Sequence, residues 1–318
     1  MILHVVLLLV GLALIVFGAD ILVEGASSVA RRFGLSEFII GLTIVGMGTS
    51  APEMVVSFIG AAHGNADIAI GNVVGSNIMN TLLILGVTAL ILPMGITREN
   101  RKRDIPVNIL TTVLLIILGL EHTLFGFGTD GLSRWDGGIL IFFFLLYMWL
   151  SFKENKANEG NDAPVQQRNI WLSLLMIAGG LAGLILGGNW FVDSATAIAK
   201  GLGVSDKFIA VTILAGGTSM PELATCVVAA AKKKGQLALG NIIGSNVFNI
   251  LLILGGSALI TPLSFTGMNW VDLGTLLVSA LVLWTCTFIG RRNEMDRVDG
   301  VLFLLIWAAY MSYLMIHL

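Results

Sequence analysis

Long apolar stretches separated by short polar segments follow one another along the whole chain. Each stretch is close to the roughly 20 residues that an α-helix needs to cross the hydrocarbon core of a bilayer. Ten such stretches can be placed, at 2–23, 36–62, 68–93, 105–122, 134–152, 170–192, 205–231, 237–261, 270–290 and 298–317. The pattern predicts an all-α polytopic membrane protein with ten transmembrane helices.

The second half of the chain repeats the first. A shift of 169 positions aligns residues 36–93 with 205–262 without a gap, and close to half of the aligned residues are identical. Five predicted spans fall in each half, and because five is odd, the second half enters the membrane from the opposite side. Inverted repeats are typical of secondary transporters. We therefore expect a first five-helix repeat at 1–152, a linker at 153–169 and an inverted five-helix repeat at 170–318.

Positive charge is divided unevenly between the two sets of loops. One set carries fifteen Lys and Arg residues, and the other carries only Arg134, Lys200 and Lys207. Short cytoplasmic loops are enriched in Lys and Arg, so we expect the first set, including the loop at 153–169, in the cytoplasm. Both termini would then lie outside, on a protein that crosses the cell (plasma) membrane several times.

Composition supports the membrane interpretation and removes several functional classes. Hydrophobic residues make up 56% of the chain and charged residues 12%, whereas a soluble protein carries about 25% charged residues. The net charge of −2 gives no sign of a nucleic-acid partner. Cys226 and Cys286 lie in apolar runs without CxxC or CxxH spacing, so they form neither a zinc site nor a disulfide framework.

Two short polar motifs interrupt apolar stretches at equivalent places in the two halves, "GTSAPE" at 48–53 and "GTSMPE" at 217–222. A proline inside a helix cannot donate to the carbonyl four residues before it. Pro52 and Pro221 are therefore predicted to free backbone carbonyls, which persist at membrane depth only where they face protein, water or a ligand. We expect the second and seventh helices to be broken at an ion site.

Glu53 and Glu222 end the two motifs with a carboxylate inside an apolar stretch. Such carboxylates are costly in a membrane unless they are matched, and every polar group near them offers oxygen. Oxygen ligands select hard cations, and Ca²⁺ takes about six to eight of them. The pair carries a charge of −2, which one Ca²⁺ or two or more Na⁺ would offset. An empty pair would resist a change of state, which gives a physical route to obligatory exchange.

A second pair of motifs follows, "GNVVGSNIMN" at 71–80 and "GNIIGSNVFN" at 240–249. The spacing of four places three polar side chains of each motif on one helix face. These are Asn72, Ser76 and Asn80 in the first half and Asn241, Ser245 and Asn249 in the second. Hydrogen bonds between helices would account for the same pattern without any ion. The motif alone leaves both interpretations open.

Together, the two paired motifs resemble the α-repeats of the sodium/calcium exchanger (cation/calcium antiporter) family, prokaryotic type. The resemblance covers essentially the whole chain. It implies ten helices and alternating access around ions held between the second, third, seventh and eighth. We therefore expect an antiporter rather than an enzyme, without a cofactor, which carries Ca²⁺ and Na⁺ as substrates and works as a monomer in the lipid bilayer.

The resemblance also implies a role for each matching residue. The Ca²⁺ site would be formed by Glu53, Glu222, Thr49 and Thr218. Sodium would use these residues and further oxygens, those of Ser50, Ser219, Ser76 and Ser245 and the backbone carbonyls near Gly46 and Ala215. The middle of the site would be lined by Asn80 and Asn249.

The expected function is exchange of Na⁺ for Ca²⁺ without K⁺, because Asn249 stands where some relatives, K⁺-dependent ones among them, carry Asp. The alternative is an H⁺/Ca²⁺ or other cation/Ca²⁺ antiporter, although the proton-coupled branch resembles "GNxxE" and here Gly takes the place of that Glu. A cation channel would use the same oxygens without coupling. An intramembrane protease would need a metal-binding His pair or an activated nucleophile, and the sequence offers neither.

Overall fold

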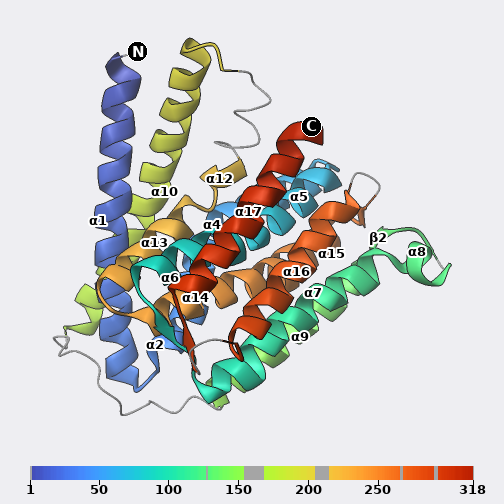
Figure 1. Cartoon of the computed structure of the whole chain (residues 1–318), viewed down its shortest axis with the longest axis horizontal. Helices are drawn as coiled ribbons and strands as arrows, with labels where there is room; N and C mark the ends of the chain where they lie inside the picture. The colour runs from blue at the N-terminus through green and yellow to red at the C-terminus, as the bar shows by residue number, and fades with distance from the viewer. Residues whose placement is uncertain are drawn as a thin grey trace.

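The computed structural model describes residues 2–126, 128–153, 168–204, 215–265, 268–289 and 293–317. Within these ranges the regular secondary structure is helical apart from four strands of two residues each. Two long helices, α1 and α10, lie side by side at one edge of the molecule, and the remaining helices form a bundle beside them (Figure 1). The predicted linker and the start of the predicted seventh span, with Lys207, fall largely or wholly outside the described residues.

The elements of the first half run from the N-terminal helix to residue 153. They are α1 (Ile2–Phe33), α2 (Glu37–Ile40), η1 (Gly41–Val45), α3 (Gly46–Thr49), α4 (Ala51–Ala62), α5 (Ala66–Met79), η2 (Asn80–Ile84), α6 (Leu85–Ile91), β1 (Met94–Gly95), η3 (Asn100–Asp104), α7 (Ile105–Gly119), α8 (Glu121–Phe125), β2 (Gly131–Leu132) and α9 (Arg134–Lys153). The η segments are π-helical turns that continue into α-helix.

The second half repeats this order. Its elements are α10 (Ile170–Gly201), α12 (Ala215–Gly217), α13 (Met220–Ala231), α14 (Gly235–Phe248), η5 (Asn249–Leu254), α15 (Gly255–Ile260), β3 (Leu263–Ser264), α16 (Trp270–Cys286), β4 (Glu294–Met295) and α17 (Arg297–His317). Helices α13 and α14 begin 169 residues after α4 and α5, the same offset that aligns the sequence. The strands pair across the halves, β1 with β4 and β2 with β3.

The polar motif of the first half marks a break between two helices. Helix α3 ends at Thr49, α4 begins at Ala51, and the two helical stretches on either side meet at an angle of 48°. Pro52 lies in the first turn of α4, where an N–H has no intrahelical partner and its loss costs little. Pro221 has the same place in α13. Each proline therefore begins a new helix instead of interrupting one, which refines the mechanism expected for the break.

Helices α1 and α10 pack backbone to backbone. A Cβ added to Gly18 would lie 2.8 Å from the carbonyl oxygen of Gly180, and one added to Gly180 would lie 2.7 Å from that of Gly18. Gly11 and Gly187 face each other in the same way further along. Since the partner residue number falls as the other rises, the two helices run antiparallel. Small residues at such crossings let helices in membranes approach closely.

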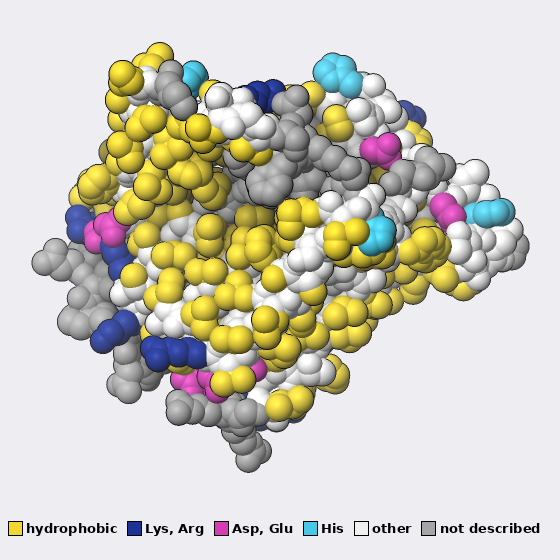
Figure 2. Space-filling model, turned by 45° about the horizontal axis from the view of Figure 1, so that its top comes forward, with side chains coloured by type: hydrophobic (Ala, Val, Ile, Leu, Met, Phe, Trp, Pro, Cys, Tyr) yellow, Lys and Arg dark blue, Asp and Glu magenta, His cyan; other side chains and the backbone are white. Residues whose placement is uncertain are grey.

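Six helices of the described residues are long and apolar enough to cross a membrane, or seven if the bent pair Glu37–Thr49 and Ala51–Ala62 counts as one span. Met220–Ala231 and Trp270–Cys286 are shorter apolar helices. The structure therefore supports a helical membrane protein, while the count of ten spans stays a prediction. Figure 2 shows hydrophobic side chains over most of one face and charged ones gathered toward its margins. Helix α14 lies innermost, since every residue from Leu237 to Phe248 is buried.

Candidate ion-binding site

Two carboxylates meet in the interior. Glu53 and Glu222, each 1% exposed, lie in the first turns of α4 and α13, where the helix dipole favours negative charge. Each accepts a hydrogen bond from the serine of the other half. Ser219 Oγ donates to Glu53 Oε1 at 3.3 Å, and Ser50 Oγ donates to Glu222 Oε1 at 3.0 Å. The fold thus joins two motifs that lie 169 residues apart in the sequence.

Four asparagines connect the helices that follow. Asn80 Nδ2 donates to Asn246 Oδ1 at 3.2 Å, and Asn249 Nδ2 donates to Asn77 Oδ1 at 2.9 Å. Asn246 is itself held by Thr81, whose Oγ1 accepts from its Nδ2 at 2.9 Å. Asn80 and Asn249 begin the π-helical turns η2 and η5, and such turns occur often at functional sites.

Among the described residues, four buried side-chain oxygens of this network have no hydrogen-bond donor. They are Oε2 of Glu53, Oε2 of Glu222, Oδ1 of Asn80 and Oδ1 of Asn249. Buried polar atoms are nearly always partnered, and the amide nitrogen of each asparagine donates to another asparagine, so these oxygens are available to a positive ligand. Two charged and two neutral oxygens suit a hard cation such as Ca²⁺ or Na⁺.

The backbone carbonyl of Gly46 is surrounded by donors from both halves. Ser50 N lies 3.1 Å from it, Ser245 Oγ 3.2 Å and Thr49 Oγ1 3.4 Å. Thr49 Oγ1 also donates to Asn241 Oδ1 at 3.2 Å. The fold therefore brings Gly46, Thr49 and Ser245 together, as three of the predicted site residues.

The equivalent serines of the second motif, Ser76 and Ser245, have different partners. Ser76 Oγ donates to Glu53 Oε1 at 3.5 Å, whereas its counterpart Ser245 reaches the carbonyl of Gly46. Thr218 lies between α12 and α13 and is half-buried, while Thr49 is fully buried. Ala215 begins α12, and its side chain lies outside the description. The site is therefore not symmetric, although its sequence motifs nearly are.

Sequence reasoning did not single out Asn77 and Asn246 for a role. Both lie about 100° around the helix from the predicted face, yet their side chains orient Asn80 and Asn249. The sequence could have indicated both residues, because each is the asparagine of the repeated "GSN" in the second motif. Asn72 was on the predicted face, and its Nδ2 donates to the carbonyl of Glu53 at 3.1 Å.

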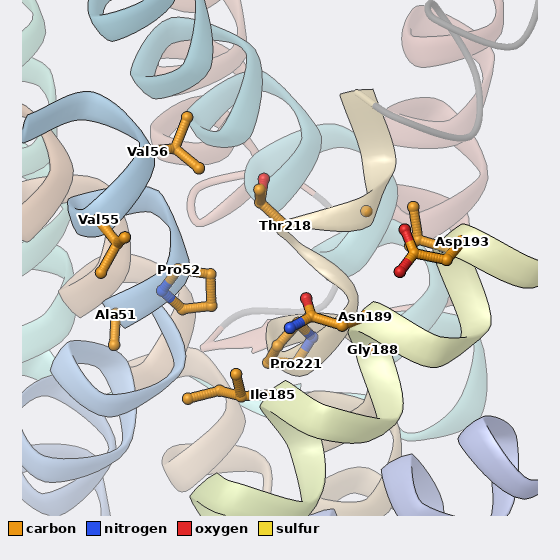
Figure 3. Close-up of a pocket in the computed structure, with 12 residues that line it drawn as sticks. Ala51, Pro52, Val55, Val56, Ile185, Gly188, Asn189, Asp193, Thr218 and Pro221 are labelled. Atoms are coloured by element: carbon orange, nitrogen blue, oxygen red, sulfur yellow. The ribbon is translucent and has the colours of Figure 1, made fainter. Parts of the chain in front are cut away.

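A cavity of about 420 Å³ lies next to the site, between α4 and α10. Pro52 and Val56 line it from α4, Asn189 and Asp193 from α10, and Thr218 from the turn before α13 (Figure 3). The half-buried state of Thr218 follows from this position. Asn189, Asp193 and Thr218 are polar residues that line the cavity, and Asp193 is the one that carries a carboxylate.

The described residues contain no group of three or more His, Cys, Asp and Glu side chains that could hold a metal ion. The site consists of two carboxylates, Glu53 and Glu222, with hydroxyl, amide and backbone groups around them. Oxygen donors of this kind are those that hard cations prefer.

Comparison with known proteins finds the family model described as sodium/calcium exchanger protein over residues 3–153 and 172–316. The chain is 38% identical to the putative antiporter CaxA of Alkalimonas amylolytica over 98% of both chains, and 35% identical to the inner membrane protein YrbG of Escherichia coli strain K12 over 99% and 98%. Among solved structures, that of the sodium-calcium exchanger NCX_Mj soaked with Na⁺ and Ca²⁺ matches with a TM-score of 0.84 and 33% identity, over 98% of each chain. The chain is thus a membrane protein that belongs to the sodium/calcium exchanger family.

Proposed function

We propose that this chain exchanges Na⁺ for Ca²⁺ across the membrane by alternating access and that it does so without K⁺. Glu53 and Glu222 supply the charge of the site. Thr49 and Thr218 complete the Ca²⁺ ligands, and Asn80 and Asn249 line the middle. The observation that carries the proposal is the set of four buried, donor-free oxygens that the two halves contribute in equal number.

Na⁺ would bind to the same oxygens as Ca²⁺ and also to the hydroxyl and carbonyl groups around them. Ser245 and Gly46 support this role, because the hydroxyl and the carbonyl lie 3.2 Å apart and would both reach one small cation. Ser50, Ser219 and Ser76 support it through their bonds to the two carboxylates. A cation between these groups would require the hydroxyl protons to turn away, so binding and the hydrogen bonds exclude each other. Ala215 is assigned by its equivalence to Gly46.

Charge balance couples the two ions. The two carboxylates carry −2, which one Ca²⁺ neutralises and which two or more Na⁺ also offset. Without either ion the pair is unbalanced in a low-dielectric interior, and the change of state is disfavoured. With Asn249 in place of Asp the site lacks a third carboxylate, which supports exchange that is independent of K⁺.

The proposal extends to the arrangement in the membrane. Ten spans would form two inverted repeats, at 1–152 and 170–318, with the segment 153–169 between them in the cytoplasm and both termini outside. The matching order of the described elements in the two halves and the pairing of strands across them support this arrangement. Since both carboxylates lie within one chain, a monomer suffices.

Uptake of ⁴⁵Ca²⁺ into proteoliposomes tests the function. With Na⁺ inside and none outside, uptake should rise above that of vesicles with equal Na⁺ on both sides, and it should be the same with K⁺ replaced by choline. Uptake that is indifferent to Na⁺ would contradict the proposal and indicate a channel. Uptake that follows a pH gradient instead would indicate an H⁺/Ca²⁺ antiporter.

A further inference from the structure

A basic residue at the end of α13 forms ion pairs with two carboxylates of α1. Lys232 is the C-cap of α13, and its Nζ lies 2.7 Å from Asp20 Oδ1 and 3.0 Å from Glu24 Oε1, both on α1. Arg168 adds a second ion pair to Glu24 at 3.0 Å. We refer to Lys232, Asp20 and Glu24 as the inner latch, since the proposed orientation places Lys232 in a cytoplasmic loop.

Next to the inner latch, α1 and α13 pack against each other. Ala19 and Val23 of α1 and Thr225 of α13 are each 0% exposed. The polar groups of the latch therefore lie at the rim of a contact whose interior excludes solvent.

The sequence repeat assigns an equivalent to each of these residues. With the offset of 169, Lys232 corresponds to His63, Asp20 to Asn189 and Glu24 to Asp193. His63 is the C-cap of α4, with φ −86° and ψ 5°, and Lys232 caps α13 with φ −84° and ψ 7°. Their amides donate to Ile59 and Val228, which are also equivalent. The backbone of the two helix ends is thus the same.

The equivalent contact is open in this structure. Where α1 meets α13, the counterparts α10 and α4 are separated by the cavity of about 420 Å³, and Asn189 and Asp193 line it. Val56, the counterpart of Thr225, lines the opposite wall (Figure 3). One pair of equivalent helices is closed by a latch and the other is open, although the two pairs have related sequences.

We infer that His63 forms an outer latch with Asp193 and Asn189 when the exchanger opens toward the cytoplasm. The inference rests on the proposed function, because it assumes that the two halves exchange conformations during alternating access. In that exchange the α4–α10 contact closes as the α1–α13 contact opens. His63 then takes the position that Lys232 has now, and the inner latch separates.

The chemistry of the three residues fits this role. A histidine ring carries an N–H donor in either charge state, and Asp193 and Asn189 both offer acceptor oxygens. His63 and Asp193 are exposed in the present state, so neither is committed to the core. The inner latch joins one lysine to two carboxylates, whereas the outer one would join a histidine to one carboxylate and one amide. The weaker outer latch favours the outward-open state that this structure has.

Two matched cysteine reporters test the inference without any transport measurement. Val56→Cys reports the cavity, and Thr225→Cys reports the equivalent closed contact, each in a background with Cys226→Ser and Cys286→Ala and in protein embedded in nanodiscs. The rate of labelling by a charged maleimide is measured for each reporter. His63→Lys should slow the labelling of Val56→Cys and speed that of Thr225→Cys, each by about two- to fivefold, as for one exposed ion pair.

Two further kinds of variant test whether the change in labelling depends on the proposed contact of residue 63 with Asp193. Asp193→Asn added to His63→Lys should return both rates toward those of the parent, and Lys232→Asn alone should shift them in the same direction as His63→Lys. His122→Lys adds the same charge to another exposed histidine and should change neither rate. Unchanged rates in His63→Lys, or a shift that persists with Asp193→Asn, would overturn the inference. Labelling reports which contact is open and not whether transport is driven by Na⁺, so with Ca²⁺ present in every sample, failure of Na⁺-driven uptake with an intact latch would refute only the proposed function.

Discussion

Glu53→Gln isolates the contribution of one carboxylate to ion binding. The substitution keeps the size of the side chain and leaves an oxygen that can accept the hydrogen bond from Ser219, now 3.3 Å from Oε1. It removes one of the two negative charges in a place that is 1% exposed. Any loss of binding can therefore be attributed to charge and not to packing.

The magnitude follows from the burial of the pair. Removing one partner from a buried ionic interaction costs about 3–5 kcal/mol, and about 1.4 kcal/mol corresponds to a tenfold change in affinity. The dissociation constant for Ca²⁺ should thus rise by roughly two to three and a half orders of magnitude. Since the halves contribute equal oxygens, Glu222→Gln should have an effect of the same size.

Equilibrium binding of ⁴⁵Ca²⁺ to the purified protein measures this change, with Glu99→Gln as the control because Glu99 is exposed and far along the chain from either motif. Thermal unfolding without Ca²⁺ shows that the variant is folded. Its midpoint should equal or exceed that of the parent, because the substitution removes one of two neighbouring buried carboxylates. A Ca²⁺ affinity within threefold of the parent would refute the assignment of Glu53.

Three further outcomes are expected. Asn246→Ala removes the group that orients Asn80 and should weaken Ca²⁺ binding by about 10- to 100-fold, as for other residues that support a ligand; an unchanged affinity would contradict this role. Gly180→Ala places a methyl group 2.7 Å from a backbone oxygen of α1 and should lower the free energy of unfolding by about 1–3 kcal/mol, whereas Gly179→Ala, with nothing within 4 Å, should not. Equal unfolding midpoints for the two glycine variants would argue against the close packing. Asn249→Asp should make ⁴⁵Ca²⁺ uptake sensitive to K⁺ or to pH, because a third carboxylate needs a further cation; uptake that stays indifferent to both would count against the charge argument.

The sequence was sufficient for the parts of the fold that depend on local pattern. The apolar stretches indicated membrane helices, the repeat indicated two related halves, and Pro52 indicated the break that the structure places between Thr49 and Ala51. Glu53 and Glu222 could be proposed as a pair because equivalent residues of an inverted repeat meet near its axis. The structure brings both into one hydrogen-bonded network.

Tertiary contacts could not be read from the same pattern. The two halves have nearly the same motifs, but Ser245 bonds to the carbonyl of Gly46 and Ser76 to Glu53. The two halves therefore differ in local conformation in this structure, and that difference is absent from the motifs. The pairing of Lys232 with Asp20 and Glu24 was also hidden, since the residues are more than 200 positions apart.

Competition between Na⁺ and Ca²⁺ at equilibrium tests the central claim most directly, namely that both ions use one site formed by the two halves. ⁴⁵Ca²⁺ bound to the purified protein is measured as Na⁺ is added, with K⁺ added in parallel at equal ionic strength. Na⁺ should displace Ca²⁺ with a dependence steeper than one ion for one, and K⁺ should displace far less. Bound Ca²⁺ that is indifferent to Na⁺, or that Na⁺ and K⁺ displace equally, would contradict the claim.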